Sequence, residues 1–263
     1  MKQIKRVFSL FVLFAVLTSV DAFAADAGID TGTAADGYFT VFWDEVSGRK
    51  MKVGVTFEGE TTYYTYKPGT TASYAFDKGD GTYRLALYLN LSGTSYRKVA
   101  GTNVSVKLKD ALAPYLVSTA EITFEKDDAI SKKAAKLCTN LTDDEGKIVA
   151  IHNYIAGNFS YDDEFAGEVK KGTVVNYIPD TNQTLEKKTG VCYDLSAVFA
   201  AMCRSQGIPC AIAKGYTADG YHAWNMIQQN GEWVEVDITA AVIKKDCRAE
   251  DLSDCIVSIN VIR

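Results

Sequence analysis

The chain has 263 residues, of which 47% are hydrophobic, and this is enough for one large or two modest globular domains. Its formal net charge is −5, and an acidic chain without a basic cluster is a poor candidate for binding nucleic acid or anionic lipid. Its six cysteines include no Cys-x-x-Cys pair, and with only two histidines a structural zinc site is not expected. We expect no metal and no cofactor.

Residues 1–24 have the layout of a secretory signal peptide. A basic start (2–6) precedes an apolar run (7–20), and Ala-Phe-Ala at 22–24 supplies the small residues that a signal peptidase needs. A membrane anchor is the alternative, but a span needs roughly 20 apolar residues, and this run ends sooner, at Asp21. Cleavage would remove three of 28 basic and one of 33 acidic residues, so 25 − 32 gives a net charge of −7. We therefore expect a secreted or cell-surface protein without a membrane segment after processing.

Short β-strands are predicted over the first half of the processed chain. Five runs show either alternating apolar residues or a high content of Thr and Tyr, and turn residues separate them at intervals of about ten. These runs are 38–43, 51–57, 61–66, 82–89 and 103–108. This pattern is typical of an antiparallel sandwich. Because it carries no catalytic cluster, we interpret residues 25–118 as a spacer or a binding module without chemistry.

The sequence changes character near Pro114, and we place the domain boundary between Pro114 and Glu125. Helices are predicted at 127–137 and 147–159, followed by a looser stretch that contains Pro179. The second domain, residues 119–263, is therefore expected to be of the α+β class.

Cys192 is the candidate nucleophile. Gly190-Val191-Cys192 opens a helix that is expected to run to about Gln206. In the first turn of a helix, the unpaired N–H groups and the dipole stabilise a thiolate. Cys203 and Cys210, by contrast, stand among apolar residues and are expected to be buried thiols.

A β-hairpin is predicted to orient a base for this thiol. The runs 221–228 and 232–239 are strand-like and are joined by Asn230-Gly231, a strong hairpin signal. In the register that this turn sets, paired positions sum to 461, so His222 and Asp237 become diagonal neighbours on one face. The other face carries the core-facing set Ala223, Ile227, Val234, Val236 and Ile238.

These motifs resemble the transglutaminase-like superfamily. The similar segments are 190–196, 204–209 and 215–216 around the thiol, 221–225, Trp233 and 237–239 around the base, and 158–162 upstream, in the right order within roughly 130–239. The resemblance implies a papain-like fold, in which a Cys-bearing helix packs on an antiparallel sheet bearing His and Asp. The preceding sandwich resembles the Ig-like modules that come before such cores in bacterial exported proteins.

The resemblance also implies a reaction. Cys192, His222 and Asp237 would form a triad that attacks a protein or peptide amide and passes through an acyl-thioester. One oxyanion donor would be the Cys192 backbone N–H. The upstream Trp of vertebrate-type transglutaminases is missing, and Tyr177, Asn182 and Gln183 are the candidates for a second donor.

Three functions stay open from the sequence. The leading one is an exported cysteine-dependent amide hydrolase or acyltransferase, of the protease or transglutaminase type. A cross-linking transglutaminase and a catalytically silent binding module at the cell surface are the alternatives. For the remaining cysteines, Cys247–Cys255 is the best candidate disulfide, because the two flank a short polar loop.

The predicted export can be tested by mass. Intact-mass analysis of protein from its natural host should give a chain that begins at Ala25, because cleavage is expected after Ala24. A mature chain that retains Met1 would contradict the prediction.

Overall fold

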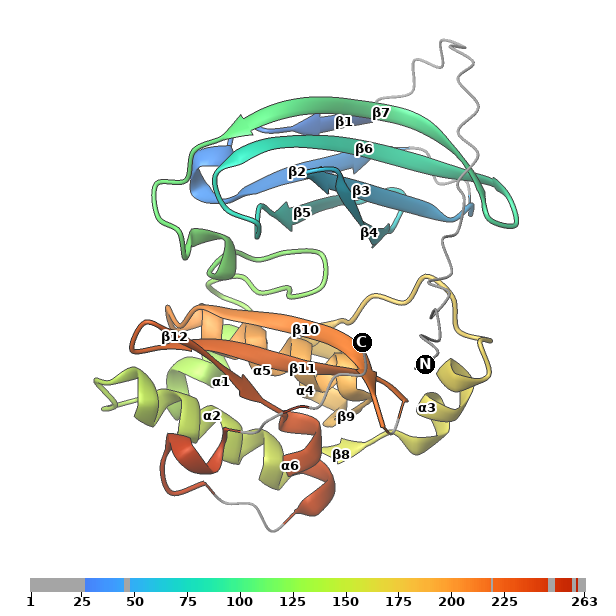
Figure 1. Cartoon of the computed structure of the whole chain (residues 1–263). Helices are drawn as coiled ribbons and strands as arrows, with labels where there is room; N and C mark the ends of the chain where they lie inside the picture. Colours follow the sequence, from blue (N-terminus) through green and yellow to red (C-terminus); the bar gives the residue numbers. More distant parts are fainter. Residues whose placement is uncertain (1–26, 45–47, 219, 246–248, 257–258, 260–263) are drawn as a thin grey trace, which may run out of the picture.

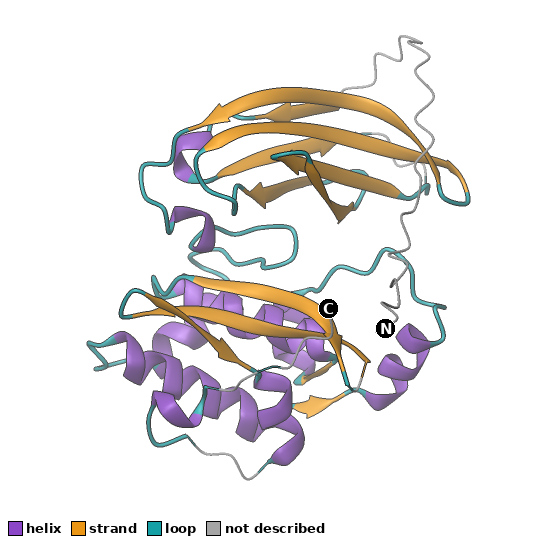
Figure 2. Ribbon diagram, viewed as in Figure 1, coloured by secondary structure: helices purple, strands orange, loops and turns teal. Residues whose placement is uncertain are grey.

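The computed structural model describes residues 27–44, 48–218, 220–245, 249–256 and 259. The predicted signal peptide and Cys247 lie outside these residues, so the signal and the Cys247–Cys255 pairing stay predictions. The described chain is a mixed α+β molecule, with antiparallel sheets first and a helix-rich unit second, as predicted (Figures 1 and 2).

The N-terminal unit consists of two antiparallel sheets that share one core. One sheet has the strand order β1 (Ala27–Asp30), β2 (Tyr38–Trp43), β5 (Thr71–Ala75). The other has the order β4 (Glu60–Tyr66), β3 (Met51–Phe57), β6 (Gly81–Ser92), β7 (Ser95–Val106). Buried residues of β2 and β5 pack against those of β3 and β6 in this core. The unit is compatible with an Ig-like domain, and it also has a short 3-10 turn, η1 (Ala34–Asp36).

Period-two burial explains why these segments become strands. Along β2 every second side chain is buried, namely Phe39, Val41 and Trp43. Successive side chains of a strand point to opposite faces, so this alternation puts one apolar face on the shared core. The predicted strands are all present, and β1 and β5 are additional.

The C-terminal unit packs helices around a three-stranded sheet. Its helices are α1 (Ala129–Leu137), α2 (Asp144–Asn158), α3 (Asp163–Lys170), α4 (Thr181–Lys187), α5 (Cys192–Ser205) and α6 (Ile238–Lys244). The antiparallel sheet has the order β10 (Cys210–Thr217), β11 (Gly220–Gln229), β12 (Glu232–Val236). A two-residue parallel pair, β8 (Ser160–Tyr161) with β9 (Thr189–Gly190), and the turn η3 (Leu252–Asp254) complete it.

Aspartate caps fix where four of these helices begin. The side chains of Asp128, Asp143, Asp162 and Asp180 each accept a hydrogen bond from the backbone N–H three residues later. Such caps satisfy donors that have no partner inside the helix. Helices α1 and α2 match the predicted segments, whereas α3 and α4 are short helices within the stretch that the sequence predicted to be loose.

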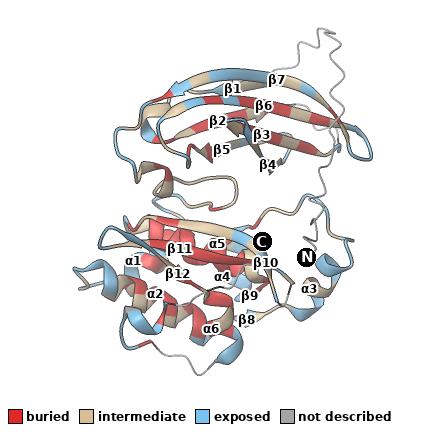
Figure 3. Ribbon diagram, in the orientation of Figure 1, coloured by how far each residue is buried: buried red, intermediate tan, exposed pale blue. Residues whose placement is uncertain are grey.

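Helix α5 lies at the centre of the C-terminal unit. Every residue from Asp194 to Arg204 is buried (Figure 3). The helix contacts α1, α2, α4, α6 and the sheet strands β10 and β11. A helix that is covered all round in this way holds both of its ends in fixed positions.

The connection between the units packs on the C-terminal unit. It contains the turn η2 (Ala113–Tyr115), and Ile122 is buried in the C-terminal core. The guanidinium of Arg204 donates from Nη1 to the Val117 carbonyl at 2.6 Å. The rings of Tyr115 and Trp233 lie 4.7 Å apart. The connecting segment is thus a structural part of the second unit. Among the residues that the structure describes, no helix is long and apolar enough to span a membrane.

The proposed domain boundary leads to a truncation test. A fragment 107–263 should fold, whereas 125–263 lacks Ile122 and the Val117 acceptor of Arg204. We expect the shorter fragment to be less stable by about 2–5 kcal/mol, as measured by urea unfolding followed by circular dichroism. Equal stability of the two fragments would show that the connection contributes nothing to the C-terminal unit.

Candidate active site

Cys192 is the first residue of α5. The first intrahelical hydrogen bond runs from the Leu195 N–H to the Val191 carbonyl, at 3.0 Å. The N–H groups of Cys192, Tyr193 and Asp194 therefore precede the helical ladder, as at any helix start. The Cys192 side chain is partly exposed. A thiol at this position lies in the positive field of the helix start and is accessible to a substrate.

The side chain of Asp194 holds the segment next to Cys192 in place through hydrogen bonds. Its Oδ2 accepts from the Val191 N–H at 3.0 Å, and its Oδ1 accepts from the Tyr177 hydroxyl at 2.5 Å. Asp194 is buried, and burial raises its pKa. A Cβ at position 190 would lie 2.6 Å from the Asp194 Cβ, so only glycine fits at Gly190. The Gly-Val-Cys-x-Asp pattern therefore has a steric basis.

The hairpin register agrees with the prediction. Asn225 pairs with Val236 and Gln229 pairs with Glu232, both of which sum to 461. Asn230 and Gly231 have φ of 51° and 88°, the left-handed values that a tight two-residue turn requires.

The predicted second strand is wrong at its end. It stops at Val236, and Asp237 caps helix α6 instead of continuing the strand to Thr239. The Oδ1 of Asp237 accepts from the N–H groups of Thr239 and Ala240 at 3.0 and 3.1 Å. Its Oδ2 lies 2.9 Å from Nε2 of His222. His222 and Asp237 therefore meet through a helix cap and are not diagonal strand neighbours.

His222 connects the carboxylate to the thiol. Its interactions with Asp237 and with Cys192 raise the pKa of His222 to about 10 against the opposing effect of burial. The imidazolium is therefore the form present at neutral pH. The ring also stacks on Trp224, with centroids 6.2 Å apart and planes 18° apart.

The structure thus brings Cys192, His222 and Asp237 together from α5, β11 and the start of α6. The opposite face of the hairpin is packed as expected, since Ala223, Ile227 and Val236 are buried and Val234 is partly buried. Ile238 is also buried, but as the first residue of α6.

The candidates for the second oxyanion donor are dispersed. The Asn182 side chain bonds the start of α1, through the Ile130 N–H and Asp128. Gln183 is exposed and bonds Lys187. The structure brings neither of them to Cys192. Tyr177 does lie beside the loop of Cys192, but its hydroxyl donates to Asp194.

Tyr161 is a residue that the sequence reasoning missed as a site residue. Its strand β8 pairs with β9, with Tyr161 opposite Gly190, two residues before the thiol. Burial raises the pKa of Tyr161, and the neighbouring Cys192 raises it further. The only sequence signal was its place in the 158–162 segment that resembles the family.

The remaining candidate groups lie elsewhere. Cys203 and Cys210 are fully buried, as predicted, and burial raises the pKa of Cys203. His152 is buried in α2, and burial lowers its pKa. Within the described ranges, no group of three or more His, Cys, Asp or Glu side chains could hold a metal ion.

Comparison with known families adds to this geometry. Residues 131–238 match the model of the transglutaminase-like superfamily. The chain carries a transglutaminase-like domain. This domain spans α1 to the start of α6 and includes all three residues gathered at the site. No curated relative matches the chain at a significant level.

Several solved structures are similar to the chain. A TGase is 21% identical over 42% of this chain and 29% of its own, with a TM-score of 0.36. A candidate cysteine protease of Cytophaga hutchinsonii is 17% identical over 81% and 71%, with a TM-score of 0.42. The periplasmic domain of TgpA from Pseudomonas aeruginosa is 13% identical over 90% and 100%, with a TM-score of 0.39. The chain thus spans less than a third of the first of these proteins.

The raised pKa of His222 predicts a pH-dependent contribution to stability. A folded-state pKa of about 10, against 6.5 for an ordinary histidine, stabilises the fold fully below pH 6.5. The contribution declines as the unfolded chain deprotonates and is lost as pH rises through about 10. The difference in free energy of unfolding between the wild type and His222→Gln should therefore shrink from pH 6 to pH 10.5 in urea titrations. A difference that stays constant over this range would contradict the assignment.

Proposed function

We propose that the protein is an exported, cysteine-dependent amide hydrolase or acyltransferase that acts on proteins or peptides. The observation that carries the proposal is that His222 interacts with both Asp237 and Cys192 at the start of α5. A thiol beside a base that a carboxylate orients is the arrangement of an activated nucleophile. The transglutaminase-like domain supports the same chemistry.

The acylation step follows from this geometry. The Cys192 thiolate attacks the carbonyl carbon of the amide, and the new C–S bond moves electrons onto the carbonyl oxygen. As the oxyanion collapses, the C–N bond breaks and the His222 imidazolium protonates the leaving amine. Asp237 stabilises the imidazolium and holds the ring through Nε2, which leaves Nδ1 for the side of the thiol.

Deacylation reverses the role of His222. The neutral imidazole takes a proton from water, or from a second amine, as that nucleophile attacks the thioester. Collapse of the second intermediate releases Cys192 as the thiolate and restores the imidazolium. Water yields a carboxylic acid, so the enzyme is a hydrolase; an amine yields a new amide, so it is an acyltransferase.

Two donors are proposed for the oxyanion. One is the Cys192 backbone N–H, which lies outside the helical ladder of α5. The other is the hydroxyl of Tyr161, whose backbone pairs with Gly190 and whose pKa is raised by Cys192. We prefer Tyr161 to Tyr177 because the hydroxyl of Tyr177 is already donated to Asp194.

Export is proposed from the N-terminal segment, with its basic start, apolar run and Ala-Phe-Ala site. The protein would then act outside the cell membrane, with residues 25–118 as a separate Ig-like domain and 119–263 as the catalytic domain. Its partners would be protein or peptide amides, and no nucleic acid is expected for a chain of this charge.

Replacing each of the three triad residues should reduce turnover to a different extent. Cys192→Ala removes the nucleophile and should abolish turnover of glutamine peptides, with or without an added amine. His222→Ala should be nearly as damaging, because the leaving amine then lacks an acid. The comparable change in a serine triad costs ~10⁴-fold. For Asp237→Asn we expect a smaller loss, on the order of 10–10³-fold, because cysteine is intrinsically the stronger nucleophile.

Matched variants separate chemistry from folding. Cys203→Ala and Cys210→Ala should keep wild-type turnover per folded molecule, since both thiols are buried away from the site. Tyr161→Phe should lower kcat by roughly 10²–10³-fold and leave alkylation of Cys192 by iodoacetamide unchanged. If Cys192→Ala retains amide hydrolysis, the thiol mechanism is wrong. If Cys192 is alkylated selectively but no amide is turned over, the silent binding module replaces the enzyme.

A further inference from the structure

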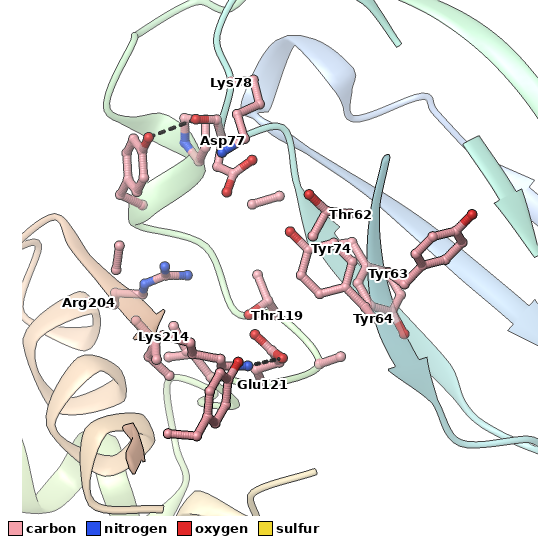
Figure 4. A pocket seen from close by; sticks show the side chains of 18 residues that line it. Thr62, Tyr63, Tyr64, Tyr74, Asp77, Lys78, Thr119, Glu121, Arg204 and Lys214 are labelled. Carbon is pink, nitrogen blue, oxygen red and sulfur yellow. Dashed lines mark hydrogen bonds and ion pairs between the residues drawn. The ribbon is translucent and has the colours of Figure 1, made fainter. Parts of the chain in front are cut away.

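A cavity of about 460 Å³ lies between the sandwich and the transglutaminase-like domain (Figure 4). Its size suits a small ligand, since pockets for such ligands hold about 300–1,000 Å³. Tyrosines from both units line it, including Tyr64 and Tyr74 from the sandwich and Tyr221 from β11. The cavity therefore exists only where the two units meet.

Arg204 places a buried positive charge at this cavity. It belongs to the last turn of α5 and is only 6% exposed. Two backbone carbonyls hold it, with Nε donating to Cys210 at 2.7 Å and Nη1 to Val117 at 2.6 Å. Among the described residues, no Asp or Glu forms an ion pair with it. Burial lowers the pKa of Arg204 to about 10, because an uncompensated charge is costly away from water.

Asp77 supplies the opposite charge from the sandwich side. Figure 4 shows the Asp77 carboxylate and the Arg204 guanidinium facing the same open space from different units. Burial raises the pKa of Asp77, and the positive charges of Lys78 and, to a smaller extent, Arg204 partly oppose this. Its backbone carbonyl accepts the Tyr115 hydroxyl at 2.9 Å, which holds the loop in place. In the described part of the chain, the two charges make no ion pair with each other.

The other charged pair at the cavity is already satisfied. Glu121 bonds Lys214 at 2.6 Å, the contact dashed in Figure 4, and also accepts the Tyr193 hydroxyl. The Lys214 ammonium lies 3.9 Å from the centre of the Tyr193 ring. Glu121 is therefore already paired, whereas Asp77 and Arg204 make no side-chain ion pair among the described residues. Lys78 also lines the cavity, next to Asp77.

We propose that this cavity is a binding site for a small zwitterion of amino-acid or dipeptide size. Arg204 binds its carboxylate, since a guanidinium fork matches a carboxylate in shape and charge. Asp77 binds its ammonium group, and the tyrosine rings cover its apolar part. The sandwich thus contributes half of a binding site, which favours the binding module over the spacer, the two interpretations that its sequence left open.

The proposed site is linked to the candidate active site through the chain neighbours of Cys192 and His222, and it does not include the thiol. Tyr193 directly follows Cys192, and its hydroxyl reaches Glu121 at the cavity wall. Tyr221 directly precedes His222 and lines the cavity. A zwitterion held by Arg204 would lie at the opposite end of α5 from Cys192, roughly 18 Å along the helix axis. Binding itself requires neither catalysis nor Cys192.

Calorimetry on the full-length Cys192→Ala protein tests the site in the absence of thiol chemistry. The probes are L-phenylalanine and L-alanyl-L-alanine, each with its N-acetylated and its C-amidated form. At least one unblocked probe should bind, and blocking either charged end should weaken it by tenfold or more. If neither unblocked probe binds, or if blocked and unblocked forms bind equally, the proposal is overturned.

A matched pair of variants assigns the ammonium contact. Asp77→Asn should weaken binding of the unblocked probe by tenfold or more. Asp80→Asn, three residues on, removes an exposed carboxylate that pairs with Lys107 and should leave the affinity unchanged. Unchanged affinity in Asp77→Asn would overturn the site as drawn. The Arg204 contact is tested without a mutation, because a change at this buried residue could impair folding. The C-amidated probes, which lack the carboxylate, test it instead.

Discussion

The burial of helix α5 is the constraint on which the rest of the structure depends. The helix is covered from Asp194 to Arg204, so neither end can move without opening the core. Its first turn carries Cys192, and its last turn carries Arg204, which bonds the connection from the sandwich. The candidate active site and the cavity between the units are therefore built on the two ends of one rigid element. A site positioned in this way is set by packing, because close-packed interiors deform little.

The carboxylate of Asp237 has two roles, as the cap of helix α6 and as the partner of His222. One oxygen satisfies two N–H groups at the start of α6, and the other bonds His222. Because the cap holds the carboxylate rigidly, the imidazole gains an oriented partner without an additional residue. The first turn of α5 follows the same logic, since Asp194 bonds Val191 and Tyr177 while Gly190 leaves room for it. In both turns, an aspartate that shapes a helix start also shapes the site.

The contact between the two units changes how the sandwich is interpreted. From its sequence it carries no catalytic cluster, and its strands are explained by core burial alone. Once folded, its loop at Asp77 faces Arg204 across a cavity, and the connecting segment packs Tyr115 on Trp233 and Ile122 in the second core. The sandwich and the transglutaminase-like domain therefore both contribute polar residues to the cavity. A ligand bound there would contact both units, in agreement with the general preference of ligands for domain interfaces.

The sequence alone determined strands β2, β3, β4, β6 and β7 of the sandwich, helices α1, α2 and α5, and the hairpin with its register. These depend on local periodicity, on the Asn230-Gly231 turn and on Gly207 and Pro209 after α5, all of which act over a few residues. It also indicated Cys192, His222 and Asp237, because helix start and hairpin register are local. Only the tertiary structure decided that Asp237 ends its strand and caps α6, that Tyr161 lies near the thiol, and that Asn182 bonds α1 instead. It also decided that Asp77 faces Arg204. Each of these four features either joins elements that are distant in the chain or goes against a local preference for strand. Packing determines such features, and a short stretch of sequence carries no information about packing.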